Sequence, residues 1–203
     1  LEACGLRENT IVVFTSDHGD MMGSHRLLAK CVMFEEAVRV PLLIRLPGQS
    51  AGKRVSGPVS QIDVVPTLLD LMEQPIPDHL QGKSLKTQLI EEGDSHCQDA
   101  VFIEWNGPNN GLGDTTGRVQ VPDWMAEMAS PEEINAAFCD SVRTIITPKG
   151  WKFNLSPLGE HELYNLQEDP QETQNLASNS AYASLMKQLT EQIREWQAET
   201  GDA

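Results

Sequence analysis

Two adjacent side chains with metal-binding atoms, Asp17 and His18, directly follow an apolar run of the chain. A carboxylate oxygen and an imidazole nitrogen are both ligands for divalent cations, and Gly19 behind them leaves the backbone free to turn both toward one ion. A hard divalent ion takes about six ligands, so the others must come from elsewhere. Taken alone, such a pair more often reflects a helix-capping Asp17 beside a polar loop residue.

Two further polar side chains follow in the same stretch. Lys30 lies thirteen positions after Asp17, and its ammonium is a compact point charge that suits an anionic ligand; the alternative is a solvated surface lysine. His25 lies eight positions after Asp17. It could donate a proton to a leaving alcohol or hydrogen-bond an anion. A supporting role beside other site residues, or no role at all, stays equally open for His25.

The elements around these residues are those of an α/β protein. Residues 10–15 (TIVVFT) form a β-branched and aromatic run that predicts a central strand of a parallel sheet, covered on both faces. Ligands of open α/β sheets bind beyond the carboxyl ends of the strands, which is where Asp17 and His18 lie. Residues 40–46 predict a second strand, and residues 61–72 predict a helix.

The character of the chain changes after residue 99. Four short strand-like segments without intervening helices predict a small antiparallel sheet: residues 101–105, 141–147, 151–155 and 162–166. An irregular stretch at 106–123 suggests a functional rim or a mobile segment, and helices are expected at 131–138 and 181–199. We therefore expect the α/β part of a larger sheet domain in residues 1–99 and an α+β subdomain, with a C-terminal helix, in residues 100–203.

The composition narrows the classes of partner. The 203 residues carry 30 acidic and 15 basic side chains, a formal net charge of -15, which argues against binding to nucleic acid or to an anionic membrane surface. No apolar stretch approaches the ~20 residues that span a bilayer. Four widely spaced cysteines favour free thiols over a zinc cluster, with a disulfide still open. The first residue is not Met, which we interpret as a cut end, so the compartment stays unknown.

Residues 15–46, TSDHGDMMGSHRLLAKCVMFEEAVRVPLLIRL, resemble the sulfatases of the alkaline-phosphatase-like superfamily. The resemblance implies a chain from the C-terminal portion of such an enzyme, with Asp17 and His18 as metal ligands and Lys30 as the contact to the substrate sulfate. It implies Ca²⁺, or Mg²⁺ or Mn²⁺, as the cofactor and a sulfate ester, on a small molecule or a glycan, as the substrate. The likeness continues in residues 60–69, 151–153 and 162–166, then in Asp169-Pro170, Glu172 and Asn175-Leu176.

The family's nucleophile is a formylglycine made within a Cys/Ser-x-Pro-x-Arg signature, and no such signature occurs in this sequence. The resemblance therefore implies that the nucleophile lies in an upstream part of the protein and that this chain alone is inactive. Two alternatives stay open. One is a phosphonate monoester or phosphodiester hydrolase of the same superfamily, and the other is a non-catalytic module that keeps the fold.

Overall fold

The apolar run before Asp17 forms strand β1, Val12–Thr15, in the computed structural model, which describes residues 1–49, 51–107 and 129–202. Inter-residue contacts divide the chain into two units, and the first comprises Leu1–Gly57, Gln61–Gln98 and Pro170–Glu172. The rest forms the second unit. The interpretation of residues 1–99 as part of a catalytic domain and of 100–203 as an appended subdomain stays a prediction.

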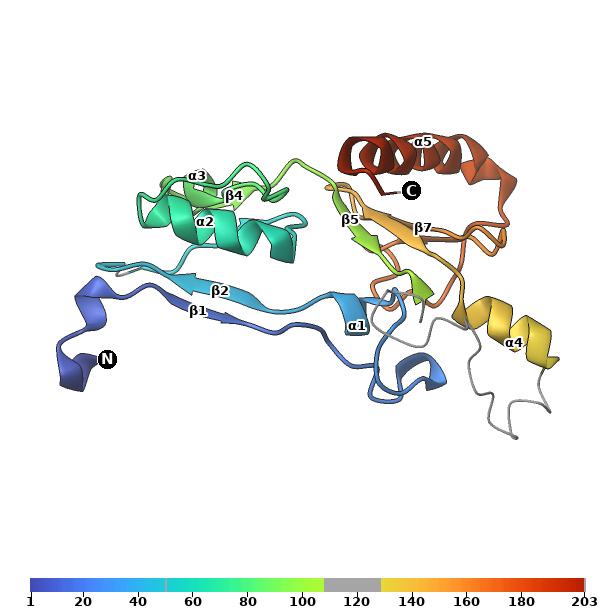
Figure 1. Cartoon of the computed structure of the whole chain (residues 1–203), viewed down its shortest axis with the longest axis horizontal. Coiled ribbons are helices and arrows are strands. Elements are labelled where there is room, and N and C mark those ends of the chain that lie inside the picture. The colour runs from blue at the N-terminus through green and yellow to red at the C-terminus, as the bar shows by residue number, and fades with distance from the viewer. Residues whose placement is uncertain (50, 108–128, 203) are drawn as a thin grey trace. The chain divides into compact units, whose positions relative to one another are not determined.

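The first unit contains two small sheets and short helices (Figure 1). β1 pairs antiparallel with β2, Leu42–Arg45, so that Phe14 lies opposite Leu43. The second sheet consists of two strands of two residues each, β3, Val55–Ser56, and β4, Ser95–His96, which pair in parallel. The helical segments are the 3₁₀ turns η1 (Glu2–Cys4), η2 (Arg7–Asn9), η3 (Ser24–Arg26) and η4 (Gln61–Asp63), and the α-helices α1 (Glu35–Val38), α2 (Val64–Leu71) and α3 (Lys86–Ile90).

The expectation that residues 10–15 form a strand covered on both faces does not hold for the described part of this chain. Phe14 is 63% exposed and Leu43 is 60% exposed, and these two residues lie opposite each other on one face of the β1–β2 pair. The neighbour of β1 is also antiparallel rather than parallel. A β-branched, aromatic run indicates a strand that suits burial, but it carries no information about strand direction or about what covers each face.

The second unit is built on one antiparallel sheet. Its strands follow the order β5-β6-β7-β8, with bounds Val101–Glu104, Arg143–Ile146, Trp151–Leu155 and Glu162–Asn165. The turn between β6 and β7 closes through a hydrogen bond from Gly150 N to Thr147 O at 2.9 Å, and Gly150 supplies the positive φ of 80° that side-chain-bearing residues disfavour. Helix α4, Pro131–Phe138, begins with a capping box made by Ser130 and Glu133.

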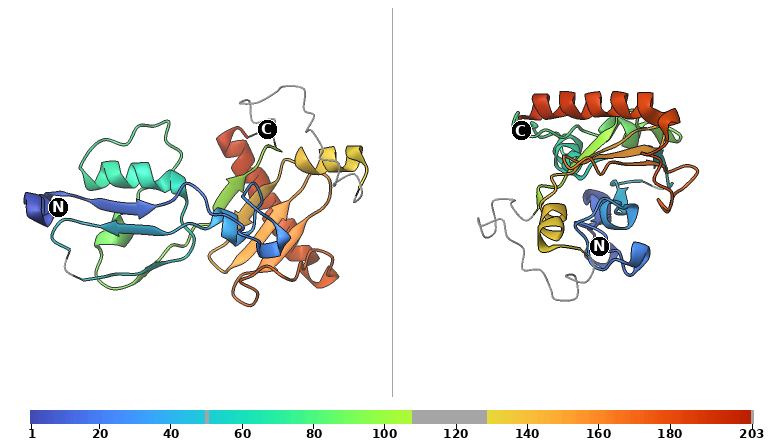
Figure 2. Two further views of the ribbon diagram at one scale, coloured as in Figure 1. Left: turned by 90° about the horizontal axis from the view of Figure 1, so that it is seen from below. Right: turned by 90° about the vertical axis from the view of Figure 1, so that its right-hand side faces the viewer.

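Helix α5, Ala183–Thr200, follows the 3₁₀ turn η7 (Ser180–Tyr182) and lies along one face of this sheet (Figures 1 and 2). Its apolar stripe closes the main core, in which five side chains are almost fully buried: Ile145, Phe153, Leu163, Leu189 and Ile193. The ring of Trp196 stacks on Phe102 of β5 with centroids 5.0 Å apart. The expected antiparallel sheet with a C-terminal helix is thus confirmed, and so is the mixed α/β class.

Two expectations about composition can be compared with the structure. Cys4, Cys31, Cys97 and Cys139 are free thiols, as expected. Within the described ranges, no helix has the length and apolar character needed to cross a bilayer. The irregular stretch expected at 106–123 lies largely outside the described residues.

Candidate metal centre and anion-binding loop

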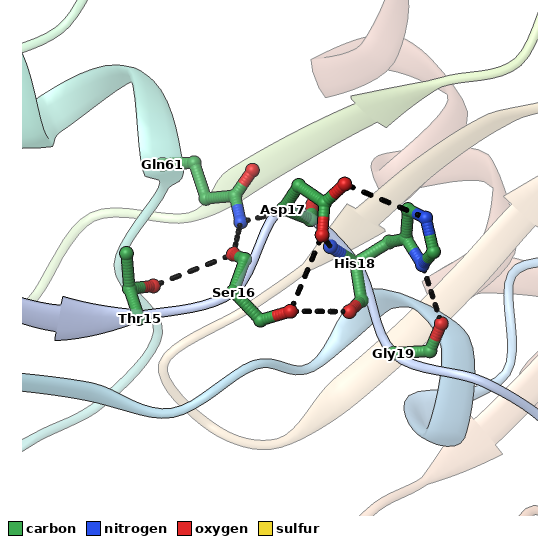
Figure 3. A network of polar contacts seen from close by, with 6 residues as sticks. All are labelled: Thr15, Ser16, Asp17, His18, Gly19 and Gln61. Atoms are coloured by element: carbon green, nitrogen blue, oxygen red, sulfur yellow. Dashed lines mark hydrogen bonds and ion pairs between the residues drawn. The ribbon is translucent and has the colours of Figure 1, made fainter.

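Strand β1 ends at Thr15, and the chain then turns through Ser16 and Asp17 into the candidate site (Figure 3). The side-chain amide of Gln61, at the start of η4, holds this turn from the side. Its Nε2 atom donates to the backbone oxygens of Ser16, at 2.6 Å, and of Asp17, at 3.1 Å. The sequence pattern predicts a helix at Gln61 and does not indicate this contact. Its only sequence signal was its place in the family-like segment 60–69.

The carboxylate of Asp17 is oriented by its neighbours and stays open to solvent. Its Oδ1 atom accepts a hydrogen bond from the backbone N–H of His18 at 3.0 Å. The hydroxyl of Ser16 lies 3.3 Å from the same oxygen and 2.8 Å from the backbone oxygen of His18, so it donates to one of them at a time. The His18 N–H is the main reason that the pKa of the Asp17 carboxyl lies below its usual value. Asp17 is therefore an ionised, 85% exposed ligand candidate.

The imidazole of His18 is fixed by the backbone. Its Nδ1 atom lies 2.6 Å from the backbone oxygen of Gly19, and because a carbonyl can only accept, Nδ1 must carry the hydrogen in this contact. In the neutral ring the other nitrogen, Nε2, then holds a lone pair. Nε2 lies 3.6 Å from Oδ2 of Asp17 (Figure 3). Two electron-rich atoms thus face each other, an arrangement that a proton or a cation between them stabilises.

These two atoms fit a divalent cation as part of a larger ligand set. Two atoms that bind the same metal ion, each at about 2.0–2.4 Å, can lie up to about 4–5 Å apart. The distance of 3.6 Å between His18 Nε2 and Asp17 Oδ2 is within this limit. A backbone carbonyl bound to the far nitrogen is also the usual support of a metal-binding imidazole. Within the described part of the chain, no group of three or more His, Cys, Asp or Glu side chains could hold an ion. Asp17 and His18 are thus two donors that need further ligands.

His25 lies in a loop with an unusual backbone. Its ring stacks on Phe34 with centroids 3.8 Å apart and planes 10° from parallel. Five residues of this loop, none of them glycine, have positive φ: Met22, His25, Arg26, Ala29 and Cys31. Such conformations are unfavourable for side-chain-bearing residues, so the loop needs support from its surroundings. Part of that support is Met21, which is 1% exposed and whose N–H donates to Ala29 O at 2.7 Å.

Lys30 lies near the end of the same loop and its side chain is exposed. Among the described residues, none forms a hydrogen bond or an ion pair with Lys30. The structure therefore brings Asp17 and His18 together, places His25 on Phe34, and leaves the Lys30 ammonium facing solvent. That Asp17, His18 and Lys30 converge on one anion-binding pocket is a prediction, and the role of His25 stays open.

Comparison with known proteins assigns the fold and the family. Residues 1–74 match the family described as Sulfatase. The ulvan-active sulfatase of Formosa agariphila is 31% identical over 206 aligned residues, which include the whole of this chain and 35% of that protein. Among solved structures, the phosphonate monoester hydrolase of Agrobacterium radiobacter has a TM-score of 0.73 at 29% identity, over 98% of this chain and 37% of that one.

A second solved structure, of a protein in complex with its substrate D-glucosamine-2-N,6-O-disulfate, has a TM-score of 0.70 at 28% identity. That match covers 100% of this chain and 37% of the other. Both the architecture and the sequence thus fall within the alkaline-phosphatase-like superfamily. The chain belongs to the sulfatase family. It spans about a third of the length of the curated relatives that it matches.

Proposed function

We propose that this chain is the C-terminal part of a sulfuric ester hydrolase, in which Asp17 and His18 are two ligands of a divalent cation. The observation that carries the proposal is the orientation of His18, whose Nε2 faces Asp17 Oδ2 at 3.6 Å because Nδ1 is engaged by Gly19 O. The lowered pKa of Asp17 keeps its carboxylate ionised as a ligand. Both residues lie within the segment that matches the family, 1–74.

Ca²⁺ is the cation that family membership favours, with Mg²⁺ or Mn²⁺ as alternatives. A carboxylate oxygen suits all three ions, and the imidazole nitrogen of His18 suits Mn²⁺ best among them. A cation bound here would supply positive charge beside the ester oxygens, where negative charge develops as the bond to the leaving alcohol breaks. Asp17 and His18 would hold it at the end of β1, and Gln61 would keep their backbone in place.

Lys30 and His25 are proposed to act on the substrate itself. The exposed ammonium of Lys30 is free to contact a non-bridging sulfate oxygen and to stabilise the charge that forms there. His25 would either donate a proton to the leaving alcohol oxygen or hydrogen-bond the sulfate. Its ring is held by the stack on Phe34, so it would approach the substrate in a defined orientation.

The nucleophile is not part of this chain, because the sequence has no Cys/Ser-x-Pro-x-Arg segment from which a formylglycine could be made. We therefore assign the hydrolytic activity to a longer protein of which this chain is one part. The chain alone is expected to leave aryl sulfates intact, and substantial turnover by it would contradict this assignment.

The substrate class that fits best is a sulfate ester on a sugar or on a small aromatic molecule. Support for a sugar comes from a sulfatase relative active on ulvan and from a related structure bound to a glucosamine disulfate. A second candidate function, hydrolysis of phosphonate monoesters or phosphodiesters, is supported by the structural match to a phosphonate monoester hydrolase. Relative rates of the complete protein on an aryl sulfate and on an aryl phosphonate monoester separate the two candidates. No turnover of either would favour a non-catalytic module.

Calorimetric titration of the 203-residue chain with Ca²⁺ and with Mn²⁺ tests the metal site directly. Asp17→Asn and His18→Ala should each weaken binding by more than the 10- to 100-fold that is typical of residues that only support a ligand. Asp78→Asn, a change of an exposed carboxylate outside the site, is the matched control and should bind as the wild type does. Equal affinity for these cations in Asp17→Asn and in the wild-type chain would contradict the proposed metal centre.

A further inference from the structure

Glu172 is a buried carboxylate in the Asp-Pro-x-Glu segment, and the proposed function gives it no role. It belongs to the first unit through the short segment Pro170–Glu172, it is 2% exposed, and its φ is 51°. Its Oε2 atom accepts a hydrogen bond from the backbone N–H of Glu35 at 2.6 Å, a contact between residues 137 positions apart. An acidic side chain held at such depth and in an unfavourable backbone conformation indicates a specific task.

The N–H that Glu172 binds is the first of helix α1. The cap residue before this helix is Phe34, which has no side chain able to accept a hydrogen bond, and α1 has no side-chain cap of its own. The first N–H groups of a helix lack partners within the helix, and a carboxylate is a favourable partner for them. Glu172 thus provides from a distant segment what Ser, Thr or Asp at position 34 would provide locally.

Helix α1 in turn holds the candidate site at three points. Its Ala37 oxygen accepts from Gly19 N at 2.8 Å, directly after His18. Its Glu36 carboxylate accepts from the Ser24 hydroxyl, directly before His25. The cap residue before the helix, Phe34, stacks on His25 itself. The backbone at Gly19 packs closely against α1, since a Cβ added at Gly19 would lie 1.9 Å from the backbone oxygen of Glu36.

A second carboxylate fixes the segment that presents Glu172. Asp169 Oδ1 accepts from Thr173 N at 3.1 Å and from the Thr173 hydroxyl at 2.9 Å, while Oδ2 accepts from Gln174 N at 2.9 Å. These bonds close the turn around residues 170–172. The two acidic residues of this segment therefore have different roles. Asp169 stabilises the turn, and Glu172 accepts the hydrogen bond from the first N–H of α1.

From these contacts we infer that Glu172 is a positioning residue, which sets the orientation of His25 through α1 and Phe34. The inference rests on the proposed function for the view that His25 faces the substrate. The link from Glu172 to His25 is independent of that view, since it consists of one hydrogen bond, one helical turn and one ring stack.

The test is the NMR signal of the His25 ring Cε1–H in the 203-residue chain, recorded at one fixed pH for all variants. The signal is assigned by its loss in His25→Ala. The ring current of the stacked Phe34 should shift this signal upfield. Phe34→Leu keeps an apolar side chain without a ring current, and its spectrum gives the chemical shift of His25 in the absence of the stack. Glu172→Ala removes the carboxylate, and the shorter side chain of Glu172→Asp no longer reaches Glu35 N. Both changes should move the His25 chemical shift toward the value in Phe34→Leu. Glu172→Gln, whose amide oxygen can accept the same N–H, should restore it.

Gln171→Ala, an exposed neighbour, is the control and should leave the His25 signal unchanged. A wild-type His25 signal in folded Glu172→Ala or Glu172→Asp overturns the inference. Global loss of structure in Glu172→Asp also overturns it, since it would make Glu172 a residue that stabilises the whole chain. If Glu172→Ala alone unfolds, the Asp variant decides.

Activity of the complete protein separates this inference from the proposed function. If both are right, Glu172→Ala should lower kcat for an aryl sulfate by about tenfold, with little change in KM and with rescue in Glu172→Gln. If the His25 signal moves while the wild-type complete protein hydrolyses no sulfate ester, the positioning role stands and the proposed function fails.

Discussion

Arg143 on β6 and Asp202, just beyond α5, form a two-pronged ion pair. Arg143 Nε lies 2.5 Å from Asp202 Oδ2, and Nη2 lies 2.7 Å from Oδ1. The side chains are only 8% and 13% exposed, so solvent screens the pair weakly. This pair attaches the C-terminal end of α5 to the sheet that the helix covers.

Asp202→Asn should therefore destabilise the chain. Loss of charged hydrogen bonds to a buried partner reduces the free energy of unfolding by about 1.5–3 kcal/mol. Urea unfolding followed by circular dichroism measures the change. Glu199→Gln, an exposed carboxylate of the same helix, is the control and should change the free energy of unfolding by less than about 0.5 kcal/mol.

The same pair predicts a pH dependence. The hydrogen bonds from Arg143 hold the pKa of the Asp202 carboxyl below its usual value. A lowered folded-state pKa means that this stabilisation is fully present above the unfolded pKa of about 3.9 and is lost as pH falls through the folded value. The difference in unfolding free energy between wild type and Asp202→Asn should thus be constant from neutral pH down to about 5 and shrink below about 4. A difference that grows on acidification would contradict the assignment.

Gln61→Ala should weaken metal binding without removing a ligand. Its amide makes two hydrogen bonds to the backbone that carries Asp17, and their loss allows the turn after β1 to move. We expect the affinity for Ca²⁺ or Mn²⁺ to fall by about 10-fold, as for other residues that support a metal ligand. Titration calorimetry measures it, with Gln74→Ala as a control, since Gln74 is exposed and its side-chain amide donates to the nearby Met72 O rather than to the turn after β1. Unchanged affinity would leave Gln61 with a purely structural role.

Lys30→Ala should affect activity and not stability. The side chain is exposed, and a change there is expected to alter the free energy of unfolding by less than about 0.5 kcal/mol. In the complete protein, loss of a group that stabilises developing charge should lower kcat about 100- to 1,000-fold. Steady-state kinetics on an aryl sulfate and thermal unfolding of the same preparations measure both effects. Lys53→Ala, outside the proposed site, provides the kinetic control, and a similar loss in both variants would count against Lys30.

The opposed pair Phe14 and Leu43 predicts a hydrophobic surface on the 203-residue chain. Both side chains are largely exposed on one face of the β1–β2 pair, and contiguous exposed apolar side chains bind hydrophobic dyes. Leu43→Ser should lower the fluorescence of an added naphthalene sulfonate dye and leave the circular dichroism spectrum unchanged. Leu158→Ser, an exposed leucine of the second unit, is the matched control and should have a smaller effect.

Much of the fold could be predicted from the sequence where local patterns determine it. β7 has the expected bounds, α4 begins at its Ser-Pro capping segment, and α5 differs from the expected helix by one or two residues at each end. The parallel pair β3–β4 was missed because a two-residue strand shows no alternation of apolar and polar residues. The exposed face of β1 was also missed, since residue types report a tendency to be buried and not the presence of a covering layer.

The candidate site, too, was predictable only in part from the sequence. Asp17 and His18 are adjacent in sequence, so their proximity was expected, and the loop after β1 is where the structure places them. The contacts that orient them come from far along the chain, from Gln61 and from α1 with its partner Glu172. Such pairings depend on the folded path of the whole chain, and no local pattern of residue types encodes them.

The bond between Glu172 and Glu35 also limits how proteins of this type can be recombined. A chimera joined near residue 99 would take the loop that carries His25 from one parent and the carboxylate that supports it from the other. Such hybrids would fold with an intact second sheet and still misalign the loop, unless the donor of the tail carries an acidic or amide side chain at the matching place. The side chain at the position of Glu172, far from the junction, would thus contribute to whether the two halves are compatible.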